Sequence, residues 1–395
     1  MKLAFSAADE AFKTELIDFL AQYCPPQARN TRDMIGSDDV DAAGVMVLPP
    51  WARDWQATLF DHGWMIPSYP RELGGRSATQ TQTFLYLEAM AQRGICRSLH
   101  FGGYAIVAPS LLEFGNAQQK AMAPAAIRGD TVWCIGMSEP GAGSDLAALA
   151  TRADDRGDHF VVNGQKVWTS YAMVAAKCFC YVRTDKDAPK HRGISLLIID
   201  LDTPGVEVRP LRHITGQAEF AQVFFDNVKV PRENLVGDLH GGWRITMAAL
   251  AHERGGLWVE GVAGCLRAVD DIIAMVKRLD LQSDSSITSR VARLYSQSHS
   301  LRALGWKGFA SFAQGSSAPE HSYMKVAVSE LQQTLYELGM DLQGAGLAVT
   351  DTVVSPDGGR WQTAFLNALA ATIGGGTSEI QRNVIAQQVL GLPRA

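Results

Sequence analysis

Two neighbouring stretches carry the side chains best suited to chemistry. Residues 137–145 read Met-Ser-Glu-Pro-Gly-Ala-Gly-Ser-Asp, in which three small residues let the backbone approach a ligand closely. Ser138, Ser144 and Asp145 add hydroxyls and a carboxylate to this loop. Residues 163–170 read Asn-Gly-Gln-Lys-Val-Trp-Thr-Ser and place an indole beside two hydroxyls. That combination suits a flat ring rich in heteroatoms, so we expect both stretches to line one site.

The elements that position these side chains are predicted to be strands. An apolar run at 132–136 breaks into the glycine-rich loop, and Asn163-Gly164 is typical of a hairpin turn because both residues tolerate a positive φ. The strand after that turn would carry Trp168. The competing interpretation is an ordinary loop followed by a strand whose tryptophan belongs to the core.

A third motif makes the pattern specific. Residues 374–382 read Gly-Gly-Gly-Thr-Ser-Glu-Ile-Gln-Arg. Together the three motifs, in their order and spacing, resemble the acyl-CoA dehydrogenase family of flavoproteins. The resemblance extends over nearly the whole chain.

The resemblance implies FAD as the cofactor. It places the pyrimidine end of the flavin against the backbone near Ser138 and the flavin N5 side against Ser170, with Trp168 covering one face of the ring. Thr377 also opens a predicted helix, so its alternative role is an N-cap, and both roles are compatible. The full set of implied cofactor contacts is Ile135, Met137, Ser138, Trp168, Ser170, Thr377 and Glu379.

Desaturating an acyl thioester requires a base for the α proton and an acceptor for the β hydride. Many family members carry a glutamate where this chain has Gly375, which cannot take a proton but can donate its N–H to the thioester oxygen. A subset resembling isovaleryl- and long-chain acyl-CoA dehydrogenases instead carries the base immediately before an arginine. That pattern matches Glu253 and Arg254. We expect Glu253 to be the base, with Glu260 as the alternative.

The implied substrate is an acyl-CoA thioester. Ser144 matches a residue on the pantetheine side, and Arg254 matches one near the substrate. Because Gly375 widens one wall of the pocket, we expect a branched or bulky acyl group, including a ring-bearing or steroid side chain. Electrons would pass to an electron-transfer flavoprotein.

The family's Arg-x-x-Phe-Gly motif, which clamps the flavin pyrophosphate of a neighbouring subunit, is not found at residues 277–304. Two alternatives therefore stay open. The chain could be the partner subunit of a hetero-oligomer that lacks a complete active site of its own, or it could be a flavin oxidase or monooxygenase. The resemblance implies a tetramer, either homomeric or heteromeric.

Composition is that of a globular protein. The 395 residues are 47% hydrophobic and 19% charged, with a net charge of −5, which argues against nucleic acid or an anionic membrane as partner. No apolar run reaches the roughly 18 residues of a membrane span, and no signal peptide is recognised, so we expect a cytoplasmic protein. The 6 cysteines lack metal-binding spacing and are expected to be reduced, with no metal site.

The predicted architecture is α+β. Apolar residues recur at helical spacing up to about residue 130, strand patterns follow, and helical spacing then returns. We expect an N-terminal α-helical domain at 1–130, a central antiparallel β-barrel-like domain at 131–238 and a C-terminal four-helix bundle at 239–395.

Overall fold

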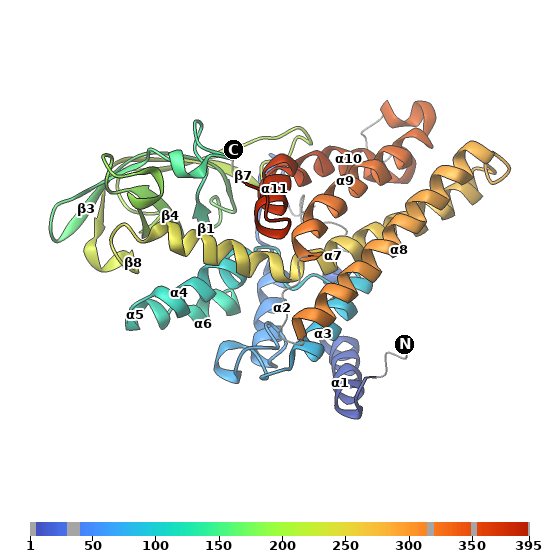
Figure 1. The fold of residues 1–395 in the computed structure, drawn as a ribbon, viewed down its shortest axis with the longest axis horizontal. Coiled ribbons are helices and arrows are strands. Elements are labelled where there is room, and N and C mark those ends of the chain that lie inside the picture. The colour runs from blue at the N-terminus through green and yellow to red at the C-terminus, as the bar shows by residue number, and fades with distance from the viewer. Residues whose placement is uncertain (1–4, 30–39, 314–319, 349–353, 394–395) are drawn as a thin grey trace. The chain divides into compact units, whose positions relative to one another are not determined.

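The computed structural model describes residues 5–29, 40–313, 320–348 and 354–393, without the side chains of 250–258, 311–313, 320–322 and 347. The chain, drawn in Figure 1, divides into two compact units. Unit 1 comprises residues 1–83 and 96–253, and unit 2 comprises 84–95 and 254–395. The expected three-domain division at residues 130 and 238 stays a prediction.

Unit 1 begins with helices. Ser6 and Asp9 form a capping box that satisfies orphan N–H groups at the start of α1, whose apolar face is buried through residues such as Leu16. A π-helical turn, η3 (Gly103–Val107), leads into α4 and contacts strand β1 of the sheet. The helices of this region are α1 (Ala7–Tyr23), α2 (Pro50–Asp61), α3 (Gln80–Gln92, whose residues from 84 on belong to unit 2), α4 (Ala108–Phe114), α5 (Ala117–Lys120) and α6 (Ala123–Arg128).

An eight-stranded sheet follows in unit 1, drawn mainly in green in Figure 1. Its order is β6-β7-β3-β2-β4-β5-β8, with β1 paired in parallel to β4, so that β6 and β8 are edges within the described chain. The β module is confirmed, but it is an open sheet and not a closed barrel. The strands are β1 (Trp133–Gly136), β2 (Arg152–Asp155), β3 (His159–Ser170), β4 (Lys177–Arg183), β5 (Ile194–Asp200), β6 (Val206–Leu211), β7 (Phe220–Pro231) and β8 (Leu235–Val236).

The predicted hairpin turn at Asn163-Gly164 is wrong. Strand β3 runs straight through both residues, and its register against β7 shifts there, which is a β-bulge. Gly164 has φ +150°, and a Cβ at this position would lie 2.6 Å from Thr151 Oγ1. The glycine therefore serves close packing in this structure. The turn between β2 and β3 uses Gly157 instead, at φ +94°.

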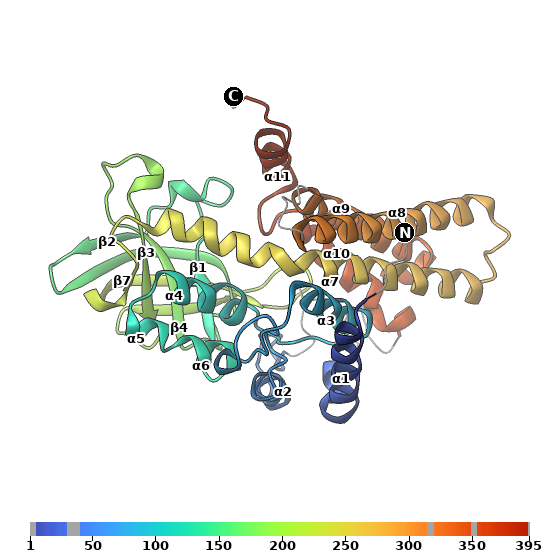
Figure 2. The ribbon, with the colours of Figure 1, turned by 60° about the horizontal axis from the view of Figure 1, so that its bottom comes forward.

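Unit 2 is helical, as expected for the C-terminal part. Long helices pack around a core that includes Cys265, Leu335 and Trp361. Figure 2 shows α8 lying alongside α9, and α9 in turn contacts α10. The helices are α7 (Gly242–Arg278, whose residues up to 253 belong to unit 1), α8 (Ser285–Ala313), α9 (Glu320–Asp341), α10 (Arg360–Ala371) and α11 (Ser378–Val384). Among the described helices, none has the length and apolarity to cross a membrane.

Candidate functional site

The glycine-rich loop begins where β1 ends. Glu139 and Ala142 exchange backbone hydrogen bonds of 3.0 Å in both directions, which closes a tight turn at the base of the loop. Above that turn, a Cβ added at Gly141 or Gly143 would meet no atom within 4 Å. Ser138 is half-buried and Ser144 is exposed. The loop is therefore fixed at its base and open at its tip, as a ligand-binding loop requires.

A buried ion pair ties this loop to β3. Lys166 Nζ lies 2.7 Å from Glu139 Oε1 and donates a second hydrogen bond of 3.1 Å to the Met137 carbonyl. The side chain of Lys166 is fully buried, and that of Glu139 is 8% exposed. The next peptide adds a backbone bond of 2.9 Å from Val167 N–H to the Ser138 carbonyl.

The Glu139 carboxylate is held by more than its ion pair. It accepts backbone hydrogen bonds from Ala150 at 2.6 Å and from Thr151 at 2.9 Å. Burial is the largest single influence on the pKa of Glu139 and would raise it. The Lys166 ammonium and these hydrogen bonds together outweigh burial and hold the pKa below its ordinary value. Glu139 is therefore ionised at neutral pH.

Trp168 is exposed on the strand that carries Lys166. A second register shift of β3 falls between Lys166 and Thr169, and Trp168 sits in this bulge with φ +58°. A positive φ is strained for a bulky residue and is held here by the surrounding strands. The indole is 55% exposed and meets Phe220 edge-on, with ring centroids 5.7 Å apart. The interpretation of Trp168 as a core residue is wrong.

The remaining motif residues of unit 1 lie on the same framework. Ile135 is on β1, paired with Phe179 of β4, and Ser170 ends β3 opposite Phe220 of β7. Asp145 forms an exposed ion pair of 2.6 Å with Lys190, an interaction that typically contributes little to stability. The predicted contact residues of unit 1 therefore lie on β1, on the loop after it and on β3, and hydrogen bonds join this loop to β3.

Helix α7 carries the predicted base. Glu253 and Arg254 lie within this helix, but their side chains are outside the described residues. Glu260, the alternative, lies seven positions after Glu253 on the same helix and is half-buried. The assignment of Glu253 as base and Arg254 as substrate contact stays a prediction.

The third motif forms an open glycine turn before α11. Lys325 Nζ donates to the Gly376 carbonyl at 2.6 Å, and Gln381 Nε2 donates to the Gly375 carbonyl at 2.9 Å. Gly375 is exposed, has φ +65°, and would carry a Cβ with no atom within 4 Å. Gln381 thus holds the peptide that follows Gly375, and Lys325 holds the next one, while the surface of Gly375 stays open.

Thr377 caps α11. Its Oγ1 accepts a hydrogen bond of 3.2 Å from the Ile380 N–H, which confirms the N-cap role expected as its alternative. The Glu379 side chain is 79% exposed, and its pKa is lowered, first by a backbone hydrogen bond and then by Thr377. A role of either residue in cofactor binding stays a prediction.

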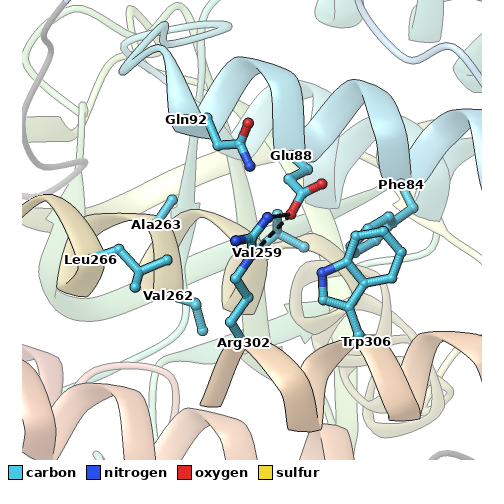
Figure 3. Close-up of a pocket in the computed structure, with 9 residues that line it drawn as sticks. All are labelled: Phe84, Glu88, Gln92, Val259, Val262, Ala263, Leu266, Arg302 and Trp306. Atoms are coloured by element: carbon cyan, nitrogen blue, oxygen red, sulfur yellow. Dashed lines mark hydrogen bonds and ion pairs between the residues drawn. The ribbon is translucent and has the colours of Figure 1, made fainter. Parts of the chain in front are cut away.

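Unit 2 also contains a small apolar cavity, shown in Figure 3. Phe84 and Trp306 line one side, and the Glu88 carboxylate faces the Arg302 guanidinium at 2.8 Å. The cavity measures about 20 Å³, room for about one water molecule. It is a packing gap between α3, α7 and α8 and is too small to take an acyl chain. Among the described residues, no cluster of side chains could hold a metal ion.

Sequence reasoning assigned no role to Glu139 or Lys166, although both lie inside the motifs. A signal was available. Lys166 is four residues after Val162 on the face of β3 that also carries Phe160, and a lysine on a buried strand face requires a partner of opposite charge. The preceding motif offers only Glu139 and Asp145 as carboxylates.

Comparison with known proteins agrees with this organisation. Residues 6–130, 134–228 and 240–390 match the N-terminal, middle and C-terminal domains of acyl-CoA dehydrogenases, respectively. A relative in Mycobacterium tuberculosis, the acyl-CoA dehydrogenase IpdE1, is 37% identical over 349 residues, which cover 87% of this chain and 88% of the relative.

Solved structures give the same result. A structure described as the Tcur3481-Tcur3483 steroid acyl-CoA dehydrogenase matches with a TM-score of 0.84 and 28% identity, covering 100% of both chains. The ChsE4-ChsE5 complex from Mycobacterium tuberculosis matches with a TM-score of 0.81 and 30% identity, again over 100% of both chains. On the strength of its three domain matches and its full-length relatives, this chain belongs to the acyl-CoA dehydrogenase family and is an oxidoreductase acting on acyl-CoA.

Proposed function

We propose that the chain catalyses FAD-dependent α,β-dehydrogenation of a bulky acyl-CoA thioester, with Glu253 as the base. The observation that carries this proposal is the pairing of an exposed, strained Trp168 with an open loop anchored by buried charges. A tryptophan that is 55% exposed in a bulge adds little to the buried core beyond its edge contact with Phe220. It fits a role as one wall of a flat ring.

The residues present fit a flavin. Trp168 offers an apolar face, and the half-buried hydroxyls of Ser138 and Ser170 lie on the segments on either side of the Lys166 anchor. Ile135 and Met137 would supply backbone contacts from the end of β1, and Thr377 and Glu379 would bind the rest of the dinucleotide. When bound, FAD supplies the hydride acceptor that amino-acid side chains cannot provide.

The substrate side uses this chain's own groups. Glu253 would remove the α proton, and the Gly375 N–H would donate a hydrogen bond to the thioester oxygen. No described residue accepts a hydrogen bond from that N–H, while Lys325 and Gln381 hold the neighbouring carbonyls in place. A donor placed at the developing oxyanion is typically worth about 10²–10³-fold in rate. Arg254 and Ser144 would contact the substrate, Ser144 on its pantetheine side.

The expected acyl group is branched or ring-bearing. Gly375 contributes no side chain where many family members carry glutamate, and its surroundings are open. The similar solved structure described as a steroid acyl-CoA dehydrogenase supports a polycyclic substrate class. IpdE1, the relative at 37% identity, is itself named an acyl-CoA dehydrogenase.

We also propose that the chain works in a hetero-oligomer with a second acyl-CoA dehydrogenase chain. The clamp motif for a neighbouring flavin is not found at residues 277–304. The ChsE4-ChsE5 structure is described as a complex of two different chains, which supports the same arrangement here. Electrons would leave through an electron-transfer flavoprotein.

Anaerobic flavin bleaching tests the proposal. The purified protein, alone and with candidate partner chains, is mixed with butyryl-, isovaleryl- and ring-bearing acyl-CoA thioesters while flavin absorbance is followed. We expect the ring-bearing thioester to bleach the flavin fastest. A clear preference for butyryl-CoA would contradict the bulky-substrate proposal, and rapid reoxidation by oxygen without any thioester requirement would favour an oxidase. Native mass spectrometry then counts flavins per chain.

A further inference from the structure

We propose that the buried Lys166–Glu139 pair positions the two flavin-binding segments and keeps their shared interior electrically neutral. The inference deepens the proposed function and rests on it. Neither residue is expected to touch the flavin or the substrate, so both are positioning residues. Their effect would pass through Met137, Ser138 and Trp168.

The geometry connects the pair to those contact residues directly. Lys166 bonds the Met137 carbonyl at 3.1 Å, and Val167 bonds the Ser138 carbonyl at 2.9 Å. On the other side, Glu139 adjoins Ser138 in the chain and fastens the loop to the 150–151 segment through two backbone N–H groups. Trp168 follows two residues after Lys166. The loop and the bulged strand are therefore anchored at one point.

The surroundings of the pair are closely packed. A Cβ added at Gly136 would lie 3.2 Å from Lys166 Cγ and within 3.3 Å of the buried sulfurs of Cys178 and Cys180. These thiols line the interior of the sheet and offer no competing full charge. If one partner is removed, the other remains as an uncompensated charge in a medium of low polarity. The loop must then shift to let water reach that charge.

The two single substitutions leave opposite charges, and this separates positioning from simple loss of stability. Lys166→Met leaves the Glu139 carboxylate unpaired, whereas Glu139→Gln leaves the Lys166 ammonium unpaired. Reduction adds electrons to the flavin, so a nearby unpaired cation favours the reduced form and an unpaired anion disfavours it. The double substitution restores neutrality without restoring the ion pair.

The experiment compares four proteins: the wild type, Lys166→Met, Glu139→Gln and the double variant. For each we measure the melting temperature of the apoprotein, the dissociation constant of FAD and the midpoint potential of the bound flavin. Each single variant should bind FAD at least about tenfold more weakly. The potential should rise in Glu139→Gln, fall in Lys166→Met and return toward the wild-type value in the double variant.

Matched controls come from the same sheet. Lys177 of β4 and Asp200 of β5 form a partly exposed ion pair. Lys177→Met and Asp200→Asn should leave FAD affinity and flavin potential unchanged, because exposed pairs contribute little.

Three results would overturn the inference. The first is a potential that moves in the same direction in both single variants. The second is unchanged FAD affinity alongside a lower melting temperature, which would reduce the pair to a stability element. The third is a wild-type protein that binds no FAD, which would overturn the proposed function as well. If a single variant fails to fold, the double variant is measured in its place. Its FAD affinity should lie within about tenfold of wild type, and a larger loss would contradict the inference.

Discussion

The two regions that carry the motifs differ in how their backbone is held in place. In unit 1, residues 137–170 are anchored by a fully buried lysine, an ionised glutamate and a strand with two bulges. In unit 2, residues 374–379 form an exposed glycine turn that is oriented through its carbonyls by Lys325 and Gln381. The first region buries one ion pair, Lys166–Glu139, and exposes the indole of Trp168. The second region presents open backbone.

This difference indicates where the reaction's base cannot lie. A general base needs a pKa near the working pH and access to the substrate. The Glu139 carboxylate accepts three hydrogen bonds, from Lys166 and from the backbone N–H groups of Ala150 and Thr151, and its pKa is lowered despite burial. Glu379 is exposed and its pKa is also lowered. Among the carboxylates outside the motifs, Glu253 remains our proposed base.

The largest expected effect comes from Glu253→Gln. Loss of the base should slow flavin reduction by about 10²–10⁴-fold while the protein keeps its yellow colour. Anaerobic stopped-flow absorbance with the preferred thioester measures this rate. Glu260→Gln, on the same helix, is the matched control and should reduce the flavin at the wild-type rate. The reverse result would assign the base to Glu260.

Acidification tests the buried pair without a substitution. The pKa of Glu139 in the folded protein lies below its ordinary value of 4.5, so its stabilising contribution is complete above that pH. The contribution is lost as pH falls through the lower, folded value. Urea unfolding from pH 7 down to pH 3 should therefore show a steeper loss of stability in the wild type than in Glu139→Gln. Parallel curves would contradict the pKa assignment.

Gly164→Ala tests the close packing of the first region. The new Cβ would lie 2.6 Å from Thr151 Oγ1 and 2.7 Å from the Thr151 Cα, and the rigid backbone cannot yield cheaply. We expect a loss of about 1–3 kcal/mol in the free energy of unfolding. Gly141→Ala, where no atom lies within 4 Å, is the control and should change stability little. Urea denaturation of both variants measures the difference.

Gly375→Ala has the smallest expected effect on folding and tests the openness of the second region. Its φ of +65° costs an alanine about 1–2 kcal/mol, with no steric clash. If this residue shapes the acyl pocket, turnover of ring-bearing thioesters should fall more than turnover of straight-chain ones. Competition assays with both thioesters measure that ratio. An unchanged ratio would remove Gly375 from the pocket wall.

Local sequence pattern was sufficient for the order of structural classes. Helical spacing in the first and last parts of the chain and strand spacing between them predicted the confirmed α+β architecture, because periodicity follows from which face of an element is buried. The three motifs likewise indicated the family through their order and spacing. Both are properties of residues close together in the chain.

Tertiary contacts decided the features that the pattern left open or misassigned. Asn163-Gly164 favours a turn locally, but pairing of β3 with both β2 and β7 keeps the strand extended and converts the glycine into a bulge. Trp168 is turned outward by a second bulge that only the β7 register creates. Glu139 and Lys166 are 27 residues apart and meet only when the sheet forms. Because an unpaired charge in the interior is costly, each of these buried groups requires the other as its counter-ion.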